Sequence, residues 1–204
     1  VDISLASISL FGALIAIFVG TSLVYKEVDK RTIYTIISRP IDRYEFILGK
    51  YLGLVMLIGV TTLLMAAFSA VYIVLMGGSV GIIFAEAVLL IYWKLLLITA
   101  FSVLMSSLTS PLLGAIIVLS AYVFGHATGI LIDVPPQLQG TFTESLMKAV
   151  YFVVPNLSNF DIWEEYANGV EISQIYVLWT LLYGTVYTAL ILFLAALSFE
   201  NKDV

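Results

Sequence analysis

The chain has 204 residues, of which 61% are hydrophobic and 11% are charged, and its net charge is -5 at pH 7. A soluble domain carries about a quarter charged residues, so this composition excludes an ordinary soluble protein and predicts an integral membrane protein. Cysteine is absent, which excludes disulfide, thiolate and cysteine-ligated metal chemistry. The one basic cluster is mixed with acidic residues and adjoins apolar segments, so no nucleic-acid partner is expected.

Five segments are apolar over about 20 residues, the length that a helix needs to cross the hydrocarbon core. They are Ile3 to Tyr25, Tyr51 to Met76, Ala85 to Leu108, Pro111 to Ile132 and Ile175 to Phe199. A glycine-containing turn (Gly77, Gly78, Gly81) joins the second to the third. A tight turn joins the third to the fourth, with Pro111 suited to the first turn of the next helix. The sequence therefore predicts an all-α polytopic membrane protein with one transmembrane domain over residues 1–204.

The distribution of Lys and Arg predicts the side of the membrane on which each loop lies. Residues 26–50 hold six of the nine basic residues, whereas residues 133–173 hold one, Lys148, against six acids. We therefore expect 26–50 in the cytoplasm and 133–173 outside. Five spans would place Val1 outside, so a sixth span is expected before Val1 in the full protein.

The external segment 133–173 is expected to form two short amphipathic helices at the outer membrane interface. Thr143 is a suitable N-cap for a helical pattern that runs to Val154, and a second pattern runs from Asn159 to Ala167. Aromatic residues would anchor these helices at the interface, and the candidates are Tyr151, Phe152, Phe160, Trp163 and Tyr166.

The segment from Tyr25 to Lys50, YKEVDKRTIYTIISRPIDRYEFILGK, is the only long charged stretch of the chain. A helix is expected over Glu27 to Ser38, ended by Pro40, and a second helix is expected to start near Asp42 and continue into the second span. One interpretation is a positive-inside anchor that lies on the membrane. The mixture of Tyr, Thr and both charge signs favours a docking element for a soluble subunit.

This string resembles the coupling-helix region of type-2 ABC exporter permeases. The matching residues are Glu27, Arg31-Thr32, Ile36 through Ile41, Arg43, Glu45-Phe46 and Gly49-Lys50, and the subgroup that they resemble is the permease of the nitrous-oxide-reductase maturation transporter. The resemblance implies the type-2 ABC exporter permease fold in a prokaryotic inner membrane. It also implies that this segment sits in a groove of a separate cytoplasmic ATPase and that a second permease copy completes the translocation path.

The resemblance implies which side chains contact the ATPase: Glu27, Lys30, Arg31, Thr32, Tyr34, Arg39, Pro40 and Arg43. The chain contains no G-x-x-x-x-G-K-[ST] string, so it is not expected to be an enzyme itself. ATP and Mg would be bound by the partner ATPase, and no cofactor is expected in this chain. Membrane lipid and an extracytoplasmic protein are further expected partners.

Two polar residues inside the spans are candidates for the path or gate, Lys94 and His126. A charge at depth costs about 2.5–3.5 kcal/mol on insertion scales. Lys94 either anchors the helix by snorkelling outward, since a pair with Glu86 would be stretched, or it belongs to the path or a subunit interface. His126 either packs in a hydrogen bond to a neighbour such as Tyr122 or acts in gating or proton linkage. No second His, no Cys and no paired carboxylate accompanies it in the sequence, so no metal site is expected.

Two further features of these spans, a group of serines and a pair of glycines, concern helix packing or a polar path. Four serines near the inner end of the third span either line a polar path or bond to carbonyls of their own helix, which we favour: Ser102, Ser106, Ser107 and Ser110. Gly125 and Gly129 form a small-xxx-small pair that indicates close packing.

Two other functions stay open beside the exporter permease. One is an intramembrane lipid-modifying enzyme that uses His126 with Asp133 or Glu144. The other is a non-catalytic membrane scaffold whose 26–50 segment recruits a signalling protein.

Overall fold

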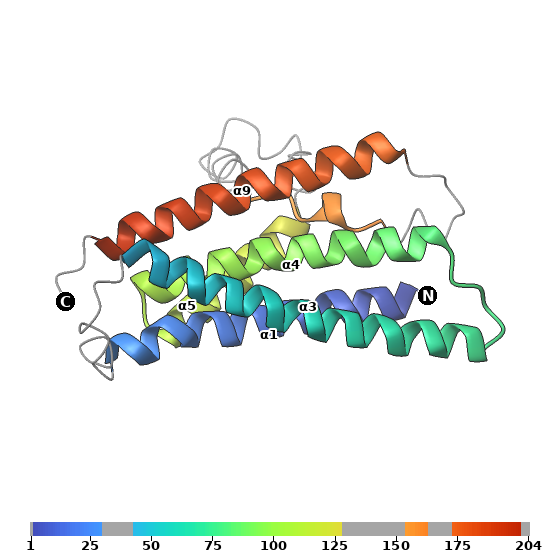
Figure 1. The fold of residues 1–204 in the computed structure, drawn as a ribbon, viewed down its shortest axis with the longest axis horizontal. Helices are drawn as coiled ribbons and strands as arrows, with labels where there is room; N and C mark the ends of the chain where they lie inside the picture. The colour runs from blue at the N-terminus through green and yellow to red at the C-terminus, as the bar shows by residue number, and fades with distance from the viewer. Residues whose placement is uncertain (1, 30–42, 128–153, 163–172, 201–204) are drawn as a thin grey trace, which may run out of the picture.

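The computed structural model describes residues 2–29, 43–127, 154–162 and 173–200, and helices make up nearly all of them (Figure 1). The long helices are α1 (Asp2–Asp29), α3 (Arg43–Leu75), α4 (Ile82–Leu108) and α9 (Gln174–Glu200). A shorter helix, α5 (Pro111–His126), and a 3-10 turn, η2 (Ser158–Phe160), complete the described elements. The expected all-α fold is confirmed.

Within the described residues, four helices are long and apolar enough to cross a membrane: Ile3–Leu23 within α1, Tyr44–Leu75 within α3, Ile82–Leu108 and Gln174–Ser198 within α9. They correspond to the first, second, third and fifth predicted spans. Helix α5 has 16 residues, about 24 Å at 1.5 Å per residue, which is shorter than the hydrocarbon core of about 30 Å. The predicted fourth span, Pro111 to Ile132, was therefore too long: its helix ends at His126, and residues 128–132 lie outside the described part.

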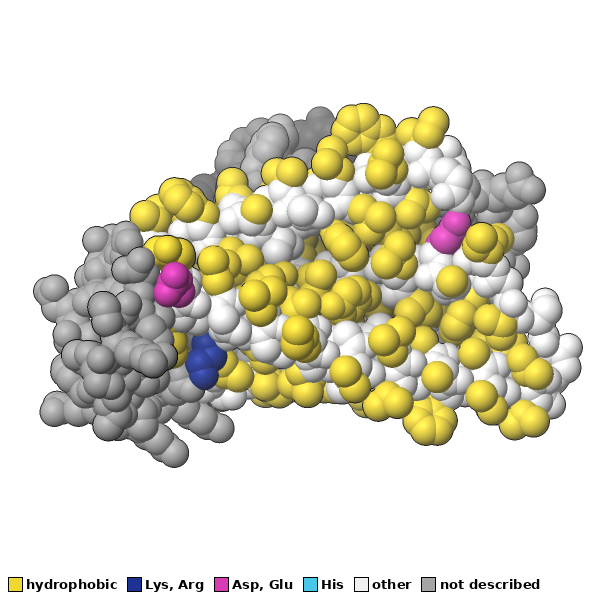
Figure 2. Space-filling model, in the orientation of Figure 1, with side chains coloured by type: hydrophobic (Ala, Val, Ile, Leu, Met, Phe, Trp, Pro, Cys, Tyr) yellow, Lys and Arg dark blue, Asp and Glu magenta, His cyan; other side chains and the backbone are white. Residues whose placement is uncertain are grey.

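Helix α4 is the centre of the bundle (Figure 1) and packs against α1, α3, α5 and α9. In its most apolar stretch 61% of residues are buried, against 22% for α3 and for α9. The outer helices expose large apolar side chains such as Leu63, Phe68 and Phe193. Figure 2 shows one face covered largely by hydrophobic side chains, with charged ones only toward its two ends. This is the surface that contact with lipid requires.

Small residues on α1 allow α4 to approach closely. A Cβ on Gly12 would lie 2.5 Å from Leu95 Cδ1, and a Cβ on Gly20 would lie 2.5 Å from Ser102 Cβ. In lipid, helix association depends on such close packing and on interhelical hydrogen bonds rather than on the hydrophobic effect. The two glycines therefore fix how α1 lies along α4.

Two of the serines near the C-terminal end of α4 bond to carbonyls of their own helix, as the sequence analysis favoured. Ser102 Oγ donates to Ile98 O at 2.9 Å, and Ser107 Oγ donates to Leu104 O at 2.7 Å. Ser106 differs, because its Oγ donates to Thr21 O of α1 at 2.8 Å. It therefore cross-links two helices instead of satisfying its own.

The connections at both ends of α4 match the turn chemistry of the sequence. Gly77 takes φ +79 after α3, a backbone conformation that suits glycine. Between α4 and α5, Ser110 is the N-cap and Pro111 begins the helix. Helix α3 runs without a break from Arg43 to Leu75, as expected for a cytoplasmic helix that continues into the second span.

Candidate functional site: a buried ionic cluster

Three ionisable side chains from separate elements meet inside the bundle, and we call Lys94, His126 and Asp161 the ionic cluster. Lys94 on α4 is fully buried, Asp161 is 7% exposed and His126, the last residue of α5, is 24% exposed. Lys94 Nζ donates to Asp161 Oδ1 and lies 3.2 Å from His126 Nε2. His126 Nε2 lies 3.0 Å from Asp161 Oδ2. A buried ammonium and a buried carboxylate thus neutralise each other beside an imidazole.

The cluster lies deep in the bundle. Lys94 follows Ile82, the first residue of α4, by 12 positions, which places it about 18 Å along the helix axis. A charge at such depth in a spanning helix is rare and marks a functional site by default. Asp161 is the counter-ion that pairs with Lys94 at this depth.

Asp161 is carried by residues 154–162, which we call the inserted segment. This segment has no regular helix beyond η2, yet its backbone is satisfied by its neighbours. Leu157 N donates to Gly125 O at 2.9 Å, and Asn156 N donates to the hydroxyl of Tyr183 at 2.9 Å. Irregular backbone is tolerated at membrane depth only where it is buried in protein in this way.

Two glycines make room for the inserted segment. A Cβ on Gly125 of α5 would lie 2.7 Å from Leu157 Cγ, and a Cβ on Gly184 of α9 would lie 2.9 Å from Phe160 Cζ. Leu157 and Phe160 are both essentially buried. The prediction that Phe160 anchors a helix at the outer interface was wrong, because its ring packs between helices.

The structure brings together the two residues that the sequence singled out separately. Lys94 does not snorkel, since it is fully buried and paired, and Glu86 instead accepts a hydrogen bond from Gln174 Nε2 at 2.6 Å. The expected hydrogen bond of His126 to Tyr122 is confirmed, because His126 Nδ1 lies 2.8 Å from Tyr122 O. The ring centroids of His126 and Tyr122 are 4.3 Å apart.

The sequence analysis missed Asp161 as the partner of Lys94 and His126. The signal was present, because an acid inside the apolar run Phe160-Asp161-Ile162 is unusual in the way that Lys94 is. No group of three His, Cys, Asp or Glu side chains that could hold a metal ion occurs among the described residues. In the cluster, His126 Nε2 contacts both the carboxylate of Asp161 and the ammonium of Lys94. The arrangement therefore suits charge pairing and proton exchange.

Two of the eight predicted ATPase-docking residues, Glu27 and Arg43, lie at one end of the bundle. Glu27 lies in the last turns of α1, and Arg43 is the first residue of α3, so both ends of the segment emerge on the same side (Figure 1). The other six, Lys30, Arg31, Thr32, Tyr34, Arg39 and Pro40, lie outside the described residues, as do Asp133, Glu144, Gly129, Lys148, Thr143, Tyr151, Phe152, Trp163 and Tyr166.

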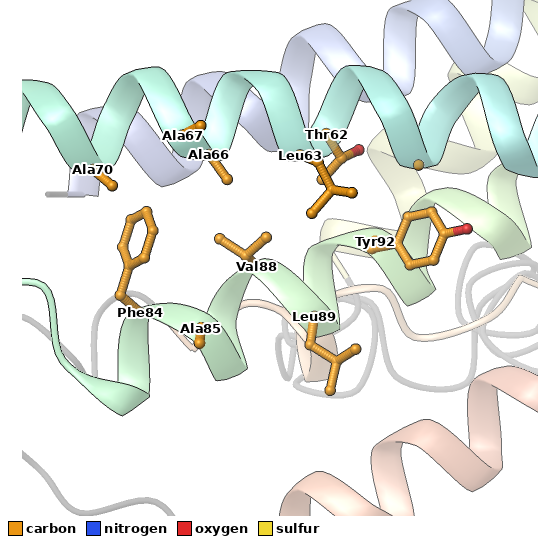
Figure 3. Close-up of a pocket in the computed structure, with 11 residues that line it drawn as sticks. Thr62, Leu63, Ala66, Ala67, Ala70, Phe84, Ala85, Val88, Leu89 and Tyr92 are labelled. Atoms are coloured by element: carbon orange, nitrogen blue, oxygen red, sulfur yellow. The ribbon is translucent and has the colours of Figure 1, made fainter.

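A groove of about 570 Å³ opens between the C-terminal half of α3 and the N-terminal half of α4 (Figure 3). It is lined by Gly59, Thr62, Leu63, Ala66, Ala67, Ala70, Phe84, Ala85, Val88, Leu89 and Tyr92. At the end of the groove formed by Gly59 and Tyr92, the Tyr92 hydroxyl donates to Val55 O at 3.2 Å. Farther along the same two helices, the Tyr51 hydroxyl donates to Leu96 O at 3.4 Å. These two bonds tie the helices together where the groove ends. The lining is almost entirely apolar, so the groove suits hydrocarbon.

Comparison with known protein families gives one match that covers nearly the whole chain. The family described as ABC-2 family transporter protein matches residues 2–204. No curated protein was found to match the chain.

Proposed function

The chain belongs to the ABC-2 family of transporter proteins, and on that premise we propose that it is the permease of an ATP-driven exporter. It is a membrane subunit of an ABC-2 transporter and not the ATPase, and membership of the family implies an ATPase partner. The observation that carries the proposal is the family match over residues 2–204, together with the four spanning helices.

We propose that residues 26–50 form the coupling segment that docks this ATPase. The segment joins the end of α1 to the start of α3, and α3 continues unbroken for 33 residues. A displacement at Arg43 would therefore move a rigid helix that contacts both α1 and α4. Helix α1 also packs closely on α4. Both helices that the segment joins, α1 and α3, therefore contact the central helix α4.

The proposal includes a second permease copy, with the substrate crossing or leaving between the two chains. ATP and Mg would be bound by the ATPase, in a prokaryotic inner membrane. An extracytoplasmic partner and the specific resemblance to the nitrous-oxide-reductase maturation transporter remain predictions that rest on the sequence. Lys94 and His126 are proposed as part of the path or its gate, and Asp161 joins them because it binds both.

The test is co-purification of an ATPase with the chain in lipid after charge reversal in the segment. We expect Glu27→Lys, Arg31→Glu and Arg43→Glu each to detach the ATPase or to uncouple its activity. Glu171→Lys, in the acidic loop predicted to lie outside, is the matched control and should change neither. The proposal fails if no ATP-binding partner co-purifies, or if all three reversals leave a bound and fully coupled ATPase.

A further inference from the structure

His126 is held so that one of its nitrogens has a fixed role. Nδ1 lies 2.8 Å from the backbone carbonyl of Tyr122. A carbonyl oxygen only accepts hydrogen bonds, so Nδ1 carries a hydrogen whether the imidazole is neutral or charged. The neutral form is therefore the Nδ1–H tautomer, and Nε2 is the atom that gains or loses a proton.

Nε2 has two partners that favour opposite protonation states of this nitrogen. Lys94 Nζ, 3.2 Å away, is a donor only, and it favours a lone pair on Nε2. Asp161 Oδ2, 3.0 Å away, is an acceptor when ionised, and it favours a hydrogen on Nε2. In the neutral form Nε2 accepts from Lys94 and its lone pair faces the carboxylate. In the protonated form Nε2–H donates to Oδ2, while Lys94 keeps its bond to Oδ1.

We propose that His126 Nε2 and Asp161 Oδ2 form a proton-binding site inside the bundle, and that the bound proton strengthens the hold on the inserted segment. The proton comes from water at the exposed edge of His126, which is 24% exposed while Lys94 is fully buried. On binding, an N–H bond forms at Nε2, and the cluster changes from net neutral to one positive charge.

The surroundings leave few other groups to share this proton. The ring of Tyr122, on the same helix, packs at a tilt against the ring of His126. Tyr183 of α9 contacts the inserted segment through its hydrogen bond from Asn156 N. Both phenols are neutral near pH 7. In the described parts of α1 and α3, every Asp, Glu, Lys and Arg lies near a helix end. Among the described residues, the charged groups in contact with His126 are therefore Lys94 and Asp161.

The direction of the effect follows from the contacts of Asp161. With His126 neutral, Lys94 is the cation that pairs with the carboxylate in the described part of the chain, and the Nε2 lone pair faces Oδ2. With His126 protonated, both of its oxygens are paired to cations, and charge-assisted bonds are about twice as strong as neutral ones. The inserted segment is therefore bound more tightly when His126 is protonated.

The direct test is nitrogen NMR of the only histidine in the chain. The full transporter is reconstituted in lipid with ¹⁵N-histidine in this chain alone and without a polyhistidine tag. We expect the neutral form to carry its proton on Nδ1 and the acid form to gain one on Nε2. Asp161→Asn should weaken proton uptake at Nε2 and so move the midpoint to lower pH, since it removes a neighbouring opposite charge. A neutral form protonated at Nε2, or a midpoint that Asp161→Asn does not move, would overturn the proposal.

A second measurement reads the hold on the inserted segment. The chain contains no cysteine, so Asn159→Cys places a single thiol on the segment, and the bond from Tyr176 to the backbone carbonyl of residue 159 is retained. Its labelling rate is compared with that in an Asn159→Cys, His126→Gln double variant at about pH 5 and about pH 8. The ionisation of the thiol cancels in the ratio of the two rates. We expect several-fold greater protection with His126 present at the lower pH only, and an equal ratio at both pH values would refute the proposed direction. Neither measurement depends on where the ATPase docks, so their failure is distinct from failure of the proposed function.

Discussion

Removing one charge of the ionic cluster should destabilise the protein far more than removing both. In Lys94→Met, the carboxylate of Asp161, 7% exposed, keeps only His126 as a partner. Breaking a buried pair costs about 3–5 kcal/mol in other proteins. We therefore expect a loss of about 3–4 kcal/mol in the free energy of unfolding.

The complementary variant, Asp161→Leu, leaves the ammonium of Lys94 with His126 Nε2 as a remaining acceptor. Its cost should be somewhat lower, about 2–4 kcal/mol. The double variant Lys94→Met with Asp161→Leu removes both charges and replaces them with apolar groups of similar volume. Because such replacements are often neutral or stabilising, we expect it to lie within about 1 kcal/mol of the wild type.

The assay is unfolding of the purified protein by SDS titration in mixed micelles, followed by tryptophan fluorescence. Glu86→Gln is the matched control, because Glu86 accepts a hydrogen bond from Gln174 near the outer end of α4 and an amide oxygen can still accept it. It should change the free energy of unfolding by less than about 1 kcal/mol. Single variants that each cost under about 1 kcal/mol, or a double variant that costs as much as the two singles together, would refute the reasoning.

Three further substitutions test the packing by the same unfolding assay. Gly125→Ala should destabilise by about 1–3 kcal/mol, because its Cβ would lie 2.7 Å from an atom of the inserted segment, whereas Gly53→Ala has nothing within 4 Å and should be neutral or stabilising; equal effects would contradict this account. Phe160→Ala should cost about 3–5 kcal/mol because the ring is fully buried, and Phe193→Ala, at a ring that is 63% exposed, should cost much less; a similar cost at both positions would show that the inserted segment is not packed as described. Ser106→Ala should cost about 1 kcal/mol through loss of its bond to α1, and an unchanged free energy of unfolding would show that this bond contributes nothing.

The spanning helices and their turns could be predicted because local sequence determines them. Long apolar runs must form helices in lipid, where every backbone group needs an internal partner. The turn after α3 uses a glycine with positive φ, and α5 begins at Pro111. These signals lie within a few residues of the structures that they specify.

The extent of the fourth span could not be predicted, because the apolar run does not mark the end of α5. The helix ends at His126, where the inserted segment packs on Gly125 and the Gly125 carbonyl accepts Leu157 N. A carbonyl near a helix end is free to bond a distant residue in this way. The sequence between residues 125 and 157 gives no local sign of that contact.

Two of the three residues of the ionic cluster could be predicted from the local sequence, and the third could not. Lys94 and His126 stand out in the sequence because each is polar in an apolar helix. Asp161 lies 67 residues from Lys94, within a loop that already contains several acids, so nothing local distinguishes it from a solvated carboxylate. Only the tertiary path of the inserted segment selects it. An unpaired charge inside a predicted span is thus a reason to search the loops for its counter-ion.

The central claim is that residues 26–50 contact a separate ATPase, and photo-crosslinking tests it most directly. A photoreactive phenylalanine analogue is placed at Tyr34, within the coupling segment, and separately at Tyr176, the residue on α9 that bonds to Asn159 O. The account predicts a crosslink from position 34 to an ATP-binding subunit and none from position 176. The absence of that crosslink in a complex that hydrolyses ATP, or equal crosslinking from both positions, would contradict the account.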